Sequence, residues 1–171
     1  MDQQRSKGSV VLVDDDLSVR RLLAEALRLE GFDVETSSNA QEGWDLIDRT
    51  EPDVAVLDVM MPGGDGLGLL ARLRASVRHR DLPVALLTAR AQQEDIDRGR
   101  QLGADAYITK PFSIEQLVWH LEEMRLTRST KATPTAPAEP LERLRRHGPL
   151  SLQAIVERSM SQDATLAARV S

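Results

Sequence analysis

Three short runs of consecutive apolar residues constrain most strongly what this chain can fold into. They are Val10–Val13, Val54–Leu57 and Val84–Leu87, and two weaker runs lie at Phe32–Glu35 and Ala106–Thr109. Apolar runs without polar alternation are typical of strands that are buried on both faces of a parallel sheet. We therefore expect five strands in one parallel sheet.

The segments between these runs have helical periodicity. Leu17–Glu30 places its apolar residues on one stripe, and Gly31 follows where the helix would stop. Asn39 is a suitable cap for a second helix that ends near Thr50. Three more helices are expected at Gly66–Ser76, Gln92–Leu102 and Ser113–Leu126. This alternation predicts an α/β fold, a doubly wound five-stranded parallel sheet with five flanking helices.

The composition excludes several classes of protein and site. No apolar run approaches the roughly 18 to 20 residues of a membrane span, and the polar start lacks the apolar centre of a secretion signal. We expect a cytoplasmic protein without membrane contact. The absence of cysteine excludes disulfides and thiolate metal sites. His79, His120 and His147 lack the spacing that binds a metal from one helix, and we expect them at the surface.

The chain divides into three parts by composition. Residues 1–126 form the expected domain, residues 127–140 a proline-rich linker, and residues 141–171 a short helical tail. The first part carries 15 basic and 23 acidic residues, a net charge of −8, whereas residues 127–171 carry 7 and 4, a net charge of +3. The acidic body argues against DNA binding through its own surface, while the basic tail permits it.

Polar residues follow the expected strands at the point where each strand ends. Asp14–Asp16 come directly after the first strand, Asp58 ends the third, Thr88 the fourth, and Lys110 follows the fifth. The carboxyl ends of parallel neighbouring strands meet at one edge of a sheet, where ligand sites form. Several carboxylates gathered there repel one another unless a cation joins them. Magnesium suits a site made of a few carboxylates.

The other residues at this edge indicate what the metal would serve. A lysine ammonium at Lys110 and a hydroxyl at Thr88 suit the oxygens of a phosphoryl group in transfer. Asp58 stands alone at the end of its strand, so it is the best candidate for the nucleophile, whereas Asp14 and Asp15 can hold the metal together. The expected product is an aspartyl phosphate.

Five motifs together resemble the receiver domain of bacterial two-component response regulators over Ser9–Leu126. They are Val13-Asp14-Asp15-Asp16, Leu57-Asp58-Val59-Met60-Met61-Pro62-Gly63-Gly64-Asp65-Gly66, Leu87-Thr88-Ala89, Gly103-Ala104-Asp105-Ala106-Tyr107 and Lys110-Pro111-Phe112. The resemblance implies a flavodoxin-like sheet of strand order 2-1-3-4-5. It also implies that a partner histidine kinase donates the phosphoryl group.

The resemblance assigns roles at matching positions only. Asp58 matches the phosphoacceptor, and Asp14 and Asp15 match the acidic pair that binds Mg²⁺ with it. Met60 would add its backbone carbonyl to the metal. Thr88 and Lys110 match the residues that assist phosphoryl transfer, and the bond from Lys110 to Pro111 is expected to be cis. Asp16 matches a variable position, expected at the surface.

A second set of matches concerns the response to phosphorylation. Thr88 and Tyr107 match a switch pair; the alternative is that Tyr107 is a core aromatic only. The readout surface would combine the helix at Gln92–Leu102, the fifth strand and the helix from Ser113. Ala106 replaces a charged residue that regulators with a winged-helix output often carry, so their salt-bridged dimer is not indicated. Another homodimer is compatible with the sequence.

The output of the signal leaves two classes of function open. The chain is either an interaction module that acts through protein partners, or a transcription regulator whose basic tail is a partial DNA-binding helix-turn-helix, loosely matched by residues 149–170. The tail can also be a docking element or a solvated segment. An independent enzyme is not expected. Phosphatases of the haloacid-dehalogenase type require a second aspartate two residues after the first, where this chain has Met60.

Overall fold

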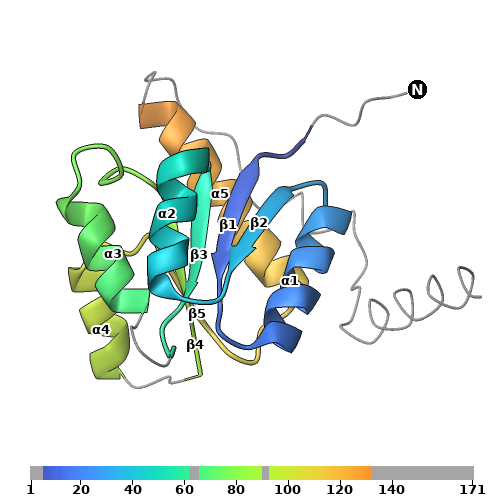
Figure 1. Ribbon diagram of the computed structural model, residues 1–171, viewed down its shortest axis with the longest axis horizontal. Coiled ribbons are helices and arrows are strands. Elements are labelled where there is room, and N and C mark those ends of the chain that lie inside the picture. Colours follow the sequence, from blue (N-terminus) through green and yellow to red (C-terminus); the bar gives the residue numbers. More distant parts are fainter. Residues whose placement is uncertain (1–5, 62–65, 90–92, 132–171) are drawn as a thin grey trace, which may run out of the picture.

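The computed structural model describes residues 6–61, 66–89 and 93–131 of the chain. The strands are β1 (Ser9–Val13), β2 (Asp33–Ser37), β3 (Val54–Asp58), β4 (Val84–Thr88) and β5 (Ala106–Thr109). The helices are α1 (Leu17–Leu29), α2 (Ala40–Thr50), α3 (Gly66–Ala75), α4 (Gln93–Gln101) and α5 (Ile114–Lys131). All strand pairs are parallel, in the order β2-β1-β3-β4-β5 (Figure 1), which confirms the predicted fold and strand order.

Helices cover both faces of the sheet, and this explains the unbroken apolar runs. Along β1, Val10 and Leu12 belong to the core cluster that includes α1 and α5 residues. Val11 and Val13 belong to the other cluster, with α2 and α3 residues. Because successive side chains of a strand point to opposite faces, a strand with a core on each side must be apolar at every position.

The structure confirms the predicted cap at Asn39 and the predicted stop at Gly31, and it adds a cap at Asp16 that was not predicted. The Asp16 carboxylate caps α1 by accepting hydrogen bonds from the amides of Ser18 (2.8 Å) and Val19 (3.1 Å). Asn39 caps α2, its side-chain oxygen accepting from the Glu42 amide at 2.9 Å. Gly31, just after α1, has a φ of 94°, a left-handed conformation that favours glycine.

Helix α5 is longer than predicted. It runs to Lys131 rather than Leu126, into the segment interpreted from sequence as a linker. Two contacts accompany this extension: the Thr127 hydroxyl donates to the Glu123 carbonyl at 2.9 Å, and the Arg128 guanidinium lies 3.4 Å from the Pro52 carbonyl. The rest of the predicted linker and the tail at 141–171 lie outside the described residues.

The expectation that the histidines lie at the surface is wrong for His79, whose exposed fraction is 5%. Its Nε2 lies 2.8 Å from an Asp48 carboxylate oxygen, and its ring packs edge-on against Trp44 with centroids 5.5 Å apart. A buried imidazole is tolerated because its polar nitrogen has a partner. His120 is half-buried, and His147 lies outside the described residues.

Among the helices that the structure describes, none is long and apolar enough to span a membrane.

Two leucines near the end of α1 provide a matched test of this core. Leu27 is fully buried, whereas 57% of Leu29 is exposed. We expect Leu27→Ala to lower the free energy of unfolding by about 2–5 kcal/mol, because it leaves a cavity between the helix and the sheet. Leu29→Ala should change it by about 0.5 kcal/mol or less. Urea unfolding of both variants measures this, and equal losses would contradict the described packing.

Candidate functional site

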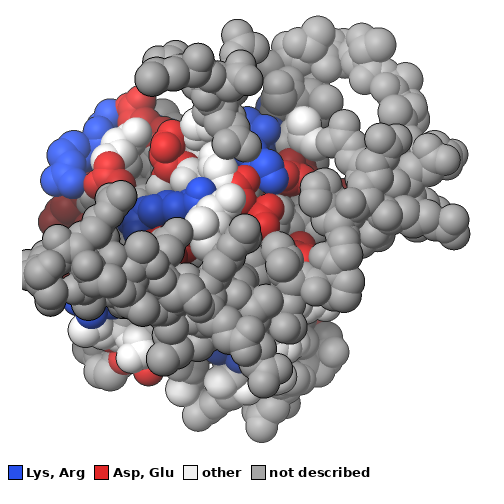
Figure 2. All heavy atoms as spheres, turned by 90° about the vertical axis from the view of Figure 1, so that its right-hand side faces the viewer, with Lys and Arg blue, Asp and Glu red and all other residues white. Residues whose placement is uncertain are grey.

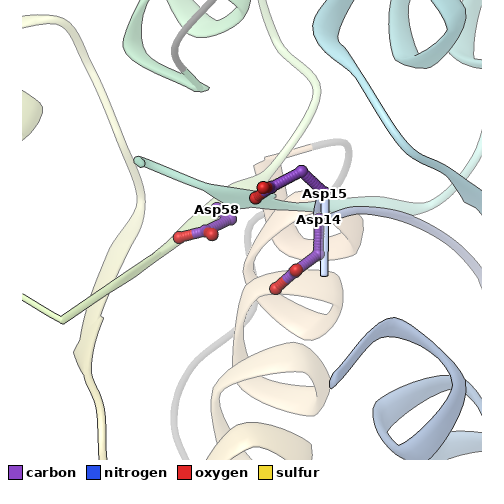
Figure 3. Close-up of side chains that lie close together, drawn as sticks. All are labelled: Asp14, Asp15 and Asp58. Carbon is purple, nitrogen blue, oxygen red and sulfur yellow. The ribbon is translucent and has the colours of Figure 1, made fainter. Parts of the chain in front are cut away.

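The candidate site lies where the carboxyl ends of β1, β3, β4 and β5 meet. Asp14 and Asp15 follow β1, and Asp58 is the last residue of β3. Figure 3 shows the three carboxyl groups gathered beside these strand ends. One carboxylate oxygen from each residue lies within 4.8 Å of those of the other two. The structure thus brings together the three acidic residues that the sequence predicted to share a site.

Burial makes this cluster costly without a cation. Asp14 is fully buried and Asp58 has an exposed fraction of 6%, while Asp15 is exposed. Burial raises the pKa of the Asp58 carboxyl; the charge of Asp14 raises it further, and the Lys110 ammonium opposes both. A bound divalent cation would offset the remaining repulsion, and all the available side-chain donors are oxygens, which suits Mg²⁺.

Lys110 lies between the two buried carboxylates. Its ammonium nitrogen is 3.3 Å from Asp14 Oδ2 and 3.5 Å from Asp58 Oδ2. Its backbone amide donates to the Thr88 carbonyl at 2.7 Å, which ties it to the end of β4. The bond to Pro111 is cis, as expected. The sheet therefore places the positive charge of Lys110 directly beside Asp58, the predicted nucleophile.

Met60 reaches the site through its backbone. Its amide lies 3.4 Å from Asp58 Oδ1, while 46% of the residue is exposed to solvent. Its main-chain amide therefore lies near the Asp58 carboxylate, and the use of its carbonyl as a metal ligand stays a prediction. Residues 62–65 of the same motif lie outside the described residues.

Gly66 is a residue of the site whose role the sequence reasoning missed. A Cβ atom at this position would lie 2.2 Å from the Asp58 carbonyl oxygen, closer than any side chain permits. Only glycine allows α3 to begin this close to the end of β3. Gly66 is the last residue of the motif around Asp58, so the sequence contained the signal. The close approach itself depends on how α3 packs beside the end of β3.

The remaining predicted residues take distinct places. Asp16 is exposed and caps α1, so it stays outside the metal cluster as expected. Thr88 is fully buried at the end of β4. Tyr107 pairs with Leu86 in the sheet register, and its buried hydroxyl has no hydrogen-bond partner within the described part of the chain. A Cβ at Gly99 of α4 would lie 3.0 Å from its ring.

The comparisons with known proteins agree with this geometry. The family model described as the response regulator receiver domain matches residues 10–122. Receiver domains are not classical enzymes. The chain is 45% identical over 120 residues to the transcriptional regulatory protein TrcR of Mycobacterium tuberculosis, covering 68% of this chain and 46% of that protein. It is 36% identical to the phosphate regulon regulator PhoB of Pseudomonas aeruginosa, covering 67% and 50%.

Solved structures show the same fold. The receiver domain of the Francisella response regulator 1452 is 32% identical with a TM-score of 0.66, and the match covers 70% of this chain and 98% of that one. The chemotaxis protein CheY4 of Vibrio cholerae is 28% identical with a TM-score of 0.65, covering 68% and 97%. The chain spans about half the length of the curated relatives named above. It belongs to the response regulators of two-component systems, through a receiver domain at residues 10–122.

Proposed function

We propose that Asp58 accepts a phosphoryl group from the phosphohistidine of a partner histidine kinase, with Mg²⁺ held by Asp14, Asp15, Asp58 and the main-chain carbonyl of Met60. The observation that carries this proposal is the set of three carboxylates within 4.8 Å of one another at the ends of β1 and β3. The ion would neutralise the charge that the phosphoryl oxygens bring to this site.

The residues of the chain account for the transfer itself. A carboxylate oxygen of Asp58 forms the new bond to phosphorus as the bond from phosphorus to the donor imidazole nitrogen breaks, and the electron pair stays on that nitrogen. The Lys110 ammonium, 3.5 Å from Asp58, is placed to attract the phosphoryl oxygens. The Thr88 hydroxyl, at the end of the neighbouring strand, is the proposed hydrogen-bond donor to them.

Phosphorylation would place a phosphoryl group that carries a charge of roughly −1.5 to −2 beside Lys110, in place of the single carboxylate charge of Asp58. We place the response on the surface formed by α4, β5 and α5, because Lys110 and Thr88 connect the site to the strand β5 that carries Tyr107. An unpartnered buried hydroxyl on Tyr107 favours a side chain with a second position over a purely structural aromatic.

Replacing Asp58 by asparagine tests the acceptor. With acetyl phosphate and Mg²⁺, the unaltered chain should gain the mass of one phosphoryl group, and Asp58→Asn should gain none, because the amide is not a nucleophile of comparable strength. Asp16→Asn is the matched control: it changes a neighbouring aspartate that caps α1, and it should still be phosphorylated. An equal gain in the Asp58→Asn protein would exclude Asp58 as the acceptor.

The same pair of variants should respond oppositely to pH in Mg²⁺-free solution. Because folding raises the pKa of Asp58 above its ordinary 3.8, its contribution to stability is fully present below that value and is lost as pH rises through the raised pKa. Asp58→Asn should therefore melt higher than the unaltered chain at neutral pH, and the difference should shrink towards pH 4.

For Asp16, amide hydrogen bonds from Val19 and Ser18 lower the pKa of the carboxyl, so its charge stabilises the fold at neutral pH. Asp16→Asn should melt slightly lower there, and its deficit should shrink as pH falls. Melting curves of the three proteins between pH 4 and pH 8 measure both trends. A lower melting temperature for Asp58→Asn at neutral pH would contradict the cost assigned to burying this carboxylate.

A second candidate function is control of transcription, favoured by the names of the two curated relatives. We propose that the basic part of the chain after residue 126, rather than the receiver, contacts DNA. On the face in Figure 2, described basic and acidic side chains are interspersed, which does not favour phosphate binding there. The residues that would neutralise phosphates include Arg143, Arg145 and Arg146.

Retention on non-specific duplex DNA tests this candidate. The full chain should be retained at low salt and released as salt rises, because each neutralised phosphate releases counterions. Deleting residues 141–171 should abolish retention, and changing Arg143, Arg145 and Arg146 to glutamine should weaken it and flatten the salt dependence. Equal retention of the full and shortened chains would exclude the tail as the DNA-binding part.

A further inference from the structure

Arg20 of α1 contacts the acidic loop through backbone carbonyls rather than through carboxylates. Its Nη1 donates to the Asp14 carbonyl at 2.6 Å and lies 3.4 Å from the Asp15 carbonyl. Both acceptors are backbone oxygens, so the contact leaves every carboxylate oxygen of the two residues available to a ligand. Arg20 is half-buried, on the first turns of the helix that follows the loop.

The loop that Arg20 contacts is short and holds like charges. Only Asp14, Asp15 and Asp16 separate β1 from α1. Asp14 is fixed by several bonds: its amide donates to the Ser37 carbonyl at 3.2 Å, and its carboxylate accepts from the Asp16 amide at 2.9 Å and from Lys110. Within the described residues, the hydrogen bond that Asp15 receives is the one from Arg20 to its backbone carbonyl.

Lys110 and Arg20 therefore act on the acidic pair in different ways. The Lys110 ammonium lies on the carboxylate side, where a phosphoryl group would bind. The Arg20 guanidinium lies on the carbonyl side, where it can oppose the repulsion between Asp14 and Asp15 without occupying a metal ligand. Groups that orient metal ligands from behind usually matter for metal affinity, since they keep the ligands in the geometry that the ion requires.

We propose that Arg20 is a positioning residue of the magnesium site, which holds the Asp14-Asp15 backbone in the conformation that presents both carboxylates to the ion. This inference rests on the proposed function, because it assumes that Asp14 and Asp15 bind Mg²⁺. It assigns Arg20 no contact with the ion or with the phosphoryl group.

Arg21 supplies a matched control on the same helix. Both arginines line one hollow of about 390 Å³ beside α1 and β2, so removing either changes the same surface by one charge. Arg21 is exposed, and it makes no hydrogen bond or ion pair to the acidic loop in the described structure. An effect that appears in Arg20→Ala and not in Arg21→Ala would therefore trace to the position of Arg20 beside the acidic loop, and not to the loss of one positive charge from α1.

The test measures Mg²⁺ affinity of the full chain and of the Arg20→Ala and Arg21→Ala variants. Affinity is taken from calorimetry with the metal alone and from the Mg²⁺ concentration that gives half the maximal rate of phosphorylation by acetyl phosphate. Arg20→Ala should bind Mg²⁺ roughly 10-fold more weakly, and saturating Mg²⁺ should recover most of the lost rate. Arg21→Ala should bind Mg²⁺ like the unaltered chain.

Three results would overturn the proposal. They are an unchanged affinity in Arg20→Ala, an equal loss in both variants, and a lower rate of Arg20→Ala that saturating Mg²⁺ leaves uncorrected. If Arg20→Ala does not fold, Arg20→Gln replaces it with the same expectation, since the amide keeps a long side chain without the guanidinium. Failure of the unaltered chain to bind Mg²⁺ would instead contradict the proposed function itself.

Discussion

The repulsion among three carboxylates at the ends of β1 and β3 is the constraint on which the rest of the site depends. Their oxygens lie within 4.8 Å of one another, and Asp14 and Asp58 are buried. A protein can hold such a cluster only with positive charge close by and a backbone that resists opening. Lys110 supplies the charge from β5, and the register of the sheet supplies the rigidity.

That register is fixed by the two hydrophobic cores. Asp58 pairs with Leu87 of β4, and its neighbour Leu57 is fully buried on one face. Because side chains alternate between faces, a slip of one residue in β3 would exchange the two buried sets and move Asp58 away from Asp14. The apolar runs that form the core therefore also position the polar residues at their ends.

The sequence was sufficient for the features that depend on local pattern, and insufficient for those that depend on distant contacts. The five strands and the cap at Asn39 follow from periodicity and side-chain chemistry. The burial of His79 depends on Asp48, 31 residues away in the chain, and no local sequence pattern predicts it. The close approach of Gly66 to Asp58 likewise becomes visible only when α3 is placed on the sheet.

The two ends of β5 in the α4–β5–α5 surface are held by different kinds of contact. The Arg74 guanidinium donates to the carbonyls of Gly103 and Leu82 and to the carboxylate of Asp105, which also accepts from the Val84 amide. These bonds fix the start of β5 to α3 and β4. At its other end, β5 leads to Lys110, whose amide donates to the Thr88 carbonyl and whose ammonium contacts the acidic cluster. Within the described part of α4, Gly99 is the buried residue, and it packs on the Tyr107 ring. In the proposed response, a change of charge at Asp58 acts on the end of β5 that leads to Lys110, and Tyr107 is the side chain through which α4 would sense it.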